Sequence, residues 1–118
     1  MKNLTLILVV ASGLTSITAG AHTALSGSQP ANEEVVAVAP EEIVLTFSAE
    51  VRLVGLSLQS DTEGHEIELG VLPSETQREF TIAIPDLSPG DYVVSWRVVG
   101  ADTHVVSGDV HFAVAEKL

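Results

Sequence analysis

Hydrophobic and polar residues alternate along several short segments of this chain. The alternation is clear over residues 79–84, 92–99 and 109–115, and it is also present over 44–47 and 51–58. Side chains two apart in a strand point to the same face of a sheet, so each segment predicts a strand with one buried face. No segment shows a convincing helical period, and the pattern therefore predicts an all-β domain. The residues expected in its core are Phe80, Ile82, Ile84, Tyr92, Val94, Trp96, Val98, Val110, Phe112 and Val114.

Turn-forming residues separate these segments, at positions 28–30, 61–64, 72–74, 88–91 and 107–108. Short strands divided by turns at near-regular intervals predict an antiparallel sandwich or small barrel with Greek-key crossings. Residues 33–39 fit either a strand or one turn of helix, because periodicity does not decide over so few positions.

The first 21 residues have the three parts of a secretory signal peptide. Lys2 supplies the positive charge, residues 4–14 form an apolar run, and Ala19 and Ala21 supply the small residues of a cleavage site. An uncleaved anchor or a buried strand is the alternative, but the run is too short and too interrupted to span a bilayer comfortably. We expect cleavage of residues 1–21, which leaves an exported, soluble domain of residues 22–118 that begins with His22.

Composition excludes several kinds of site. The chain has no cysteine, which rules out thiolate catalysis, zinc ribbons and blue-copper centres. All 16 acidic residues follow residue 21, against Arg52, Arg78, Arg97 and Lys117, so the mature chain carries a net charge of about −12 with histidines neutral. Nucleic acid and anionic membranes are poor partners for such a chain. The charge attracts cations, although plain solubility explains it equally well.

His22, Asp102 and His104 form the one constellation with specific chemistry. The α-amine and the imidazole of His22 can close a chelate ring around a metal ion. In an extended segment Asp102 and His104 face the same way, so they add one carboxylate oxygen and one imidazole nitrogen. Three nitrogens and one oxygen suit tetragonal Cu(II), which also outranks Ni(II) and Zn(II) in affinity. The alternatives are a hydrogen-bonded Asp-x-His pair that shapes a turn, and a frayed, solvated N-terminus.

The other two histidines have plainer interpretations. His65 lies in an acidic turn, where it is either a second weak ligand or a solvated turn residue, and the turn residue is the better interpretation. His111 falls on the polar side of its alternating segment, which predicts a surface position.

The order of these motifs resembles the CopC-type periplasmic copper-resistance proteins. The resemblance rests on His22 at the mature N-terminus, on Ser28-Gln29-Pro30, on residues 39–48 (APEEIVLTFS) and on residues 87–104 (LSPGDYVVSWRVVGADTH), which continue through Ser107-Gly108 into the last segment. It covers the whole mature chain, and its most specific part is the run WRVVGADTH at 96–104.

The resemblance implies a seven-stranded Greek-key β-barrel or sandwich, immunoglobulin-like or cupredoxin-like, that binds Cu(II) through His22, Asp102 and His104. Some family members add a glutamate directly after Phe-Ser as a ligand. Here Ala49 occupies that position and Glu50 follows it. A shift of one residue reverses the direction of a side chain in a regular strand, so Glu50 is a weak additional ligand only if a bulge redirects it.

The resemblance also implies a role in copper resistance, storage or trafficking, without catalysis. The only methionine is Met1, so a methionine-rich Cu(I) site of the kind some members have cannot form, and we expect a monomer that binds Cu(II) alone. A CopD-like inner-membrane protein or another periplasmic copper carrier is the expected partner. Two other classes stay open: a histidine-brace copper oxygenase, which needs a broad aromatic substrate face, and a metal-free immunoglobulin-like binding module.

Overall fold

The computed structural model describes residues 24–116, and its regular structure there consists of β-strands. This confirms the all-β prediction. Within these residues, no helix is long and apolar enough to span a lipid bilayer. The strands are β1 (Leu25–Gln29), β2 (Glu34–Val36), β3 (Glu42–Ser60), β4 (His65–Ile67), β5 (Gln77–Ala83), β6 (Gly90–Val99) and β7 (Val105–Val114).

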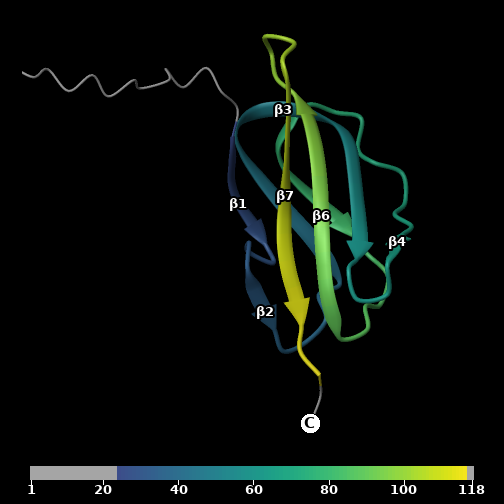
Figure 1. Cartoon of the computed structure of the whole chain (residues 1–118). Coiled ribbons are helices and arrows are strands. Elements are labelled where there is room, and N and C mark those ends of the chain that lie inside the picture. Colours follow the sequence, from purple (N-terminus) through teal and green to yellow (C-terminus); the bar gives the residue numbers. More distant parts are fainter. Residues whose placement is uncertain (1–23, 117–118) are drawn as a thin grey trace, which may run out of the picture.

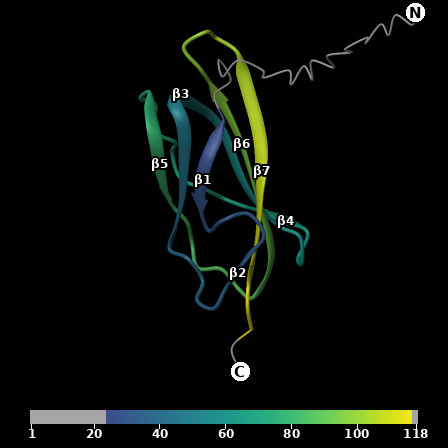
Figure 2. The same cartoon turned by 90° about the vertical axis from the view of Figure 1, so that its left-hand side faces the viewer.

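The seven strands form two layers that share the long strand β3 (Figures 1 and 2). The first half of β3 pairs with β1 and β5, and its second half pairs with β4 and β6. Strand β6 then pairs with β7, and β7 pairs with β2. The two alternating segments at 44–47 and 51–58 are thus one strand, and its pairing with β5 becomes irregular between Thr46 and Val51, where it passes from one layer to the other.

The chain changes layers a second time at Pro30. Strand β1 runs antiparallel to β3, whereas β2 runs parallel to β7 in the other layer. The ambiguous residues 33–39 therefore contain a short strand and no helix. These crossings between layers give the Greek-key sandwich or barrel that the sequence predicts.

The alternation of the sequence correctly identifies the core. Every expected core residue is buried except Ile84, which is partly buried against the others. Phe47 lies at the centre, with its ring 5.9 Å from that of Phe80 and 5.1 Å from that of Trp96, both in edge-to-face contact. Strand β3 adds Ile43, Leu45, Val51, Leu53 and Leu58 to the same cluster.

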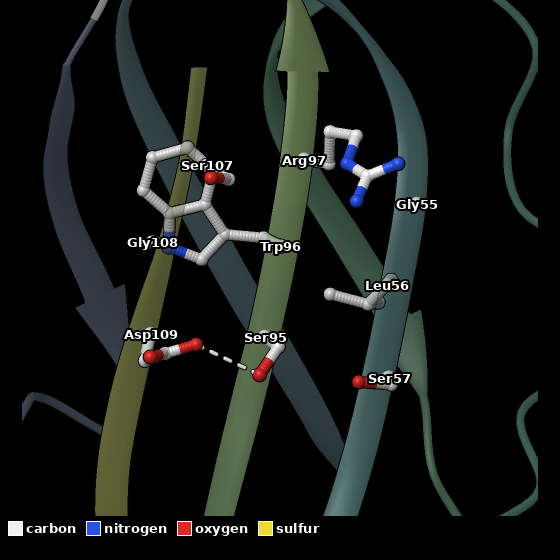
Figure 3. A pocket seen from close by; sticks show the side chains of 9 residues that line it. All are labelled: Gly55, Leu56, Ser57, Ser95, Trp96, Arg97, Ser107, Gly108 and Asp109. Atoms are coloured by element: carbon white, nitrogen blue, oxygen red, sulfur yellow. Dashed lines mark hydrogen bonds between the residues drawn. The ribbon is translucent and has the colours of Figure 1, made fainter. Parts of the chain in front are cut away.

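Gly108 lies inside a strand, where it makes room for a neighbouring side chain. The expected turn at Ser107-Gly108 is wrong, because both residues lie inside β7 and pair with Arg97 and Trp96. The indole of Trp96 lies against the backbone at Gly108 (Figure 3), and a Cβ atom there would be 2.5 Å from its Cζ2 atom. Glycine is present here because the neighbouring strand needs room for a large side chain.

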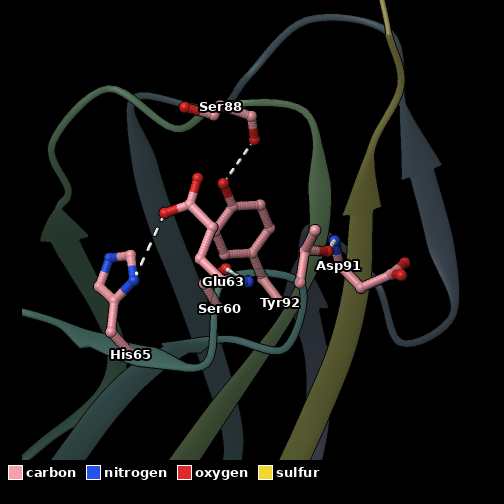
Figure 4. A network of polar contacts seen from close by, with 7 residues as sticks. Ser60, Glu63, His65, Ser88, Asp91 and Tyr92 are labelled. Atoms are coloured by element: carbon pink, nitrogen blue, oxygen red, sulfur yellow. Dashed lines mark hydrogen bonds and ion pairs between the residues drawn. The ribbon is translucent and has the colours of Figure 1, made fainter.

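The end of the molecule where β6 begins is closed by polar contacts (Figure 4). The Tyr92 hydroxyl donates to the backbone oxygen of Ser88, and burial, together with the nearby Glu63 carboxylate, raises the pKa of Tyr92. His65, which the sequence predicts as a turn residue, is instead the exposed first residue of β4, with its Nδ1 atom 3.4 Å from Oε2 of Glu63. His111 is exposed, as the alternation predicts.

Candidate metal centre

The turn between β6 and β7 carries the Asp-x-His pair, at the opposite end of the molecule (Figure 1). The backbone N–H of Thr103 donates to the oxygen of Gly100 at 3.0 Å, and that of Gly100 donates to the oxygen of His104 at 3.2 Å. The prediction of an extended segment is wrong here, because residues 100–104 form a tight turn. The turn nevertheless brings Asp102 and His104 together.

Asp102 and His104 are joined by two contacts. The backbone N–H of His104 donates to Oδ1 of Asp102 at 3.2 Å, and Nδ1 of His104 lies 2.9 Å from Oδ2. These hydrogen bonds, the side-chain one most of all, lower the pKa of the Asp102 carboxyl. The pair therefore shapes its own turn, as one of the alternative interpretations predicts, and it holds a carboxylate beside an imidazole at neutral pH.

Both side chains are open to solvent. The side chain of His104 is 83% exposed and that of Asp102 is 47% exposed. When Nδ1 donates to the carboxylate, Nε2 carries the free lone pair of the ring. This hydrogen bond fixes the orientation of the imidazole, and an ion that binds the carboxylate together with Nδ1 must take the place of the Nδ1 proton.

Thr103 is a residue of this turn that the sequence analysis did not single out. Its φ angle is 67°, in a region where a β-branched residue is an outlier, and its hydroxyl donates to the backbone oxygen of Asp102 at 2.6 Å. This conformation turns the backbone between the two candidate ligands. The sequence gives no signal for a positive φ at Thr103, because threonine is not among the residues that usually adopt one.

Ala24, the first described residue, lies at the same end of the molecule as the β6–β7 turn (Figure 1). Ala24 donates to Oγ of Ser48 at 3.0 Å and accepts from its backbone N–H at 2.9 Å, which anchors the start of β1 where β3 changes layers. Glu50, two residues after Ser48, is exposed and lines a hollow of about 340 Å³ together with Ala101 and Thr103.

Glu50 lies in the stretch of β3 between Thr46 and Val51, where the pairing with β5 is irregular. The contacts among residues 24–116 do not include one between Glu50 and either Asp102 or His104.

His22 lies outside the described residues. Within residues 24–116, no group of three or more histidines, aspartates or glutamates is arranged to hold a metal ion. Asp102 and His104 alone are a two-ligand pair, and a site of four donors requires ligands from elsewhere in the chain.

Comparisons with known proteins agree with this fold. The model of the CopC domain matches residues 25–115. Copper resistance protein C of Xanthomonas campestris pv. juglandis is 35% identical over 120 residues, which cover 93% of each chain. The protein of the same name from Escherichia coli is 33% identical over 110 residues, covering 84% of this chain and 86% of that one. Protein YobA of Escherichia coli K12 is 31% identical over 111 residues, or 90% and 89% of the two chains.

Two crystal structures have the same architecture. CopC from Methylosinus trichosporium OB3b superimposes with a TM-score of 0.69 at 30% identity, over 82% of this chain and 99% of that one. PcoC, a methionine-rich copper resistance protein from Escherichia coli, gives a TM-score of 0.65 at 31% identity, over 80% and 99%.

Proposed function

Because the chain belongs to the CopC family, we propose that it is an exported periplasmic protein that binds Cu(II) and serves copper resistance, storage or trafficking. Removal of residues 1–21 leaves His22 as the first residue. The ligands are then the α-amine and imidazole of His22, the carboxylate of Asp102 and the imidazole of His104.

The Asp102–His104 pair is the observation that carries this proposal. Two metal–ligand bonds of about 2.0–2.1 Å that meet at a right angle separate their donor atoms by about 2.9 Å. Nδ1 of His104 and Oδ2 of Asp102 are 2.9 Å apart. In the metal-free protein a proton holds the two groups at the spacing of neighbouring donors, so little rearrangement is needed when an ion replaces it.

The position of Ala24 supports the participation of His22. The backbone of Ala24 is fixed to Ser48 by two hydrogen bonds, and two further residues span at most about 7–8 Å. The described chain thus starts, two residues after His22, at the end of the molecule that carries the Asp102–His104 turn. Glu50 lines a hollow with Thr103 of that turn, which supports it as the candidate for a weak additional ligand.

The composition favours Cu(II) over Cu(I). Nitrogen and oxygen donors in a tetragonal arrangement suit Cu(II), whereas Cu(I) prefers the soft sulfur of cysteine or methionine. The chain has no cysteine, and Met1 is its only methionine. In this respect it differs from the methionine-rich PcoC protein.

A binding role fits the surface better than oxygenase chemistry. The chain has three phenylalanines, one tyrosine and one tryptophan, and all five rings are buried in the core. These rings are therefore not available to form the aromatic face that a histidine-brace oxygenase would offer to a polysaccharide. We infer a monomeric carrier that exchanges copper with a CopD-like inner-membrane protein or another periplasmic copper protein.

The direct test is Cu(II) titration of the exported protein, after mass spectrometry has fixed its N-terminus. His104→Ala and Asp102→Ala are compared with His65→Ala and His111→Ala, which remove exposed imidazoles elsewhere on the surface. We expect one Cu(II) per chain, weakened only by the first two variants, with a tetragonal electron paramagnetic resonance spectrum. Equal losses in all four variants would mean adventitious binding to surface histidines, and turnover with ascorbate and polysaccharide would mean an oxygenase.

A further inference from the structure

One patch of the surface holds two of the three arginines among the described residues. It lies on the outer face of strands β3, β6 and β7 and consists of Arg52, Val54, Arg97, Val99 and Val105, which we call the arginine patch. The remaining described arginine, Arg78, lies on β5 in the other layer.

The strand register places these residues on one face. Arg52 pairs with Val99, and Val99 pairs with Val105. Arg97 pairs with Gly55, where a Cβ atom would lie 3.5 Å from the Cβ of Arg97. Val54 is the extra residue of the register shift before Gly55. The patch is therefore continuous across three strands, close to the β6–β7 turn.

Neither arginine of the patch forms an ion pair with another described residue. Arg52 and Arg97 are exposed, and the ion pairs formed by residues 24–116 both involve histidines, not arginines. In Figure 3 the guanidinium of Arg97 leans toward β3, whereas Asp109 on β7 turns toward Ser95, whose hydroxyl donates to it at 2.7 Å.

The apolar members of the patch are also open. Val105 is 60% exposed and Val54 is 42% exposed, and Arg97 borders a hollow of about 570 Å³ on this face. Large exposed aliphatic side chains beside unpaired cations have the composition of an interaction site, in which an apolar centre is surrounded by polar groups.

The patch adjoins the proposed copper site. Arg52 lines the hollow of about 340 Å³ that Glu50 and, from the β6–β7 turn, Ala101 and Thr103 also line. A molecule that covers the patch therefore lies against the turn that holds Asp102 and His104.

We propose that the arginine patch docks a copper-exchanging protein that presents carboxylates around an apolar contact. The inference rests on the proposed function, because that function makes copper the cargo. A chain of net charge about −12 repels acidic proteins, so the two unpaired arginines mark where such a partner approaches. Two cations are too few to hold nucleic acid or an anionic membrane against that repulsion, and the valines need an apolar surface opposite them.

The test uses two synthetic peptides that share one amino-terminal Cu(II)-binding head. One has a tail of alternating glutamate and leucine, and the other has lysine and leucine. Transfer of Cu(II) from the loaded protein to each peptide is followed by stopped-flow absorbance for wild type, Arg52→Glu, Arg97→Glu and Arg78→Glu. The last variant changes the net charge equally on the other layer. The Cu(II) affinity of each variant is measured separately.

We expect Arg52→Glu and Arg97→Glu to slow transfer to the acidic peptide about two- to five-fold more than Arg78→Glu does. The difference should vanish near 1 M salt, where the screening length is about 3 Å. Equal slowing by the three variants would show that only net charge matters and would overturn the proposal.

A nuclear magnetic resonance titration of the metal-free protein with the acidic peptide separates docking from copper binding. Shifts confined to residues 52–57, 95–99 and 105–109 support the patch, and shifts elsewhere or none refute it. This result stands even if the wild-type protein fails to bind Cu(II), a failure that would refute the proposed function instead.

Discussion

Gly108→Ala places a methyl group where the structure has no room for one. The new Cβ atom would lie 2.5 Å from Cζ2 and 2.9 Å from Cε2 of Trp96. The indole has little space to retreat, because it is 6% exposed and its ring centre is 5.1 Å from that of Phe47.

Overpacking of this kind costs about 1–3 kcal/mol, and replacing glycine by alanine in a strand returns about 0.5–1 kcal/mol. We therefore expect a net loss of about 1–2 kcal/mol, or about 4–16 °C in Tm for a domain of this size.

Urea unfolding of the metal-free protein, followed by far-ultraviolet circular dichroism, measures this loss. Gly27→Ala on β1 is the matched control, because a Cβ atom there meets no atom within 4 Å. Trp96→Ala alone should cost about 3–5 kcal/mol, and Gly108→Ala should add no further loss once the indole is gone. A Gly108→Ala protein as stable as wild type, or losses that add in the double variant, would refute the packing assigned to Trp96.

Further predictions concern the site and the opposite end of the molecule. His104→Ala and Asp102→Ala should each weaken Cu(II) binding more than tenfold, about 1.4 kcal/mol, and shift the urea unfolding free energy of the metal-free protein by less than about 0.5 kcal/mol. If the metal-free variants instead lose stability to an extent comparable with their loss of Cu(II) affinity, the pair has a structural role. Tyr92→Phe should cost about 0.5–1.5 kcal/mol in the same assay, because it removes the hydrogen bond to Ser88, and no loss would contradict that role. Hydrogen bonding to His104 lowers the pKa of Asp102, so their mutual stabilisation is present above pH about 3.9 and is lost as the pH falls through the lowered pKa. Carbon-detected nuclear magnetic resonance should show that midpoint rise toward its ordinary value in His104→Ala, which keeps only the backbone hydrogen bond to Asp102, and an unchanged midpoint would contradict this cause. Cu(II) affinity should fall from pH about 8 to about 5, because the ion must displace the protons that its amine and imidazole ligands bind as the pH falls, and a flat titration would indicate carboxylates alone.

Alternation predicts the strands of this protein because one face of each is buried and the other is solvated. Tyr92 to Val98 and Val110 to Val114 show this directly, since every second residue is buried. The sequence wrongly predicts a turn at residues 107–108, because serine and glycine are typical of turns. The space that Trp96 needs beside Gly108 arises only when β6 and β7 pair, so the local sequence gives no sign of it. The continuity of β3 across residues 48–50 is also hidden, because Ser48, Ala49 and Glu50 interrupt the apolar pattern where the strand passes from one layer to the other.

The candidate site shows a different limit. Spacing alone selects Asp102 and His104, but for a reason that the structure corrects: a tight turn with a positive φ at Thr103 brings them together, and not an extended segment. The arginine patch is not predictable from sequence, because Arg52 and Arg97 become neighbours only through the pairing of β3 with β6.

The proposed copper site depends most on the N-terminus of the mature protein. Its central test is to add one alanine before His22 and to compare Cu(II) affinity and the electron paramagnetic resonance spectrum with those of the protein that begins at His22, with His65→Ala as the control. The added peptide bond turns the amine into an amide that does not coordinate without deprotonation. We expect affinity to fall far more than in the control and a nitrogen donor to be lost from the spectrum. Unchanged affinity and an unchanged spectrum in the extended protein would contradict the assignment of His22 and place the copper elsewhere.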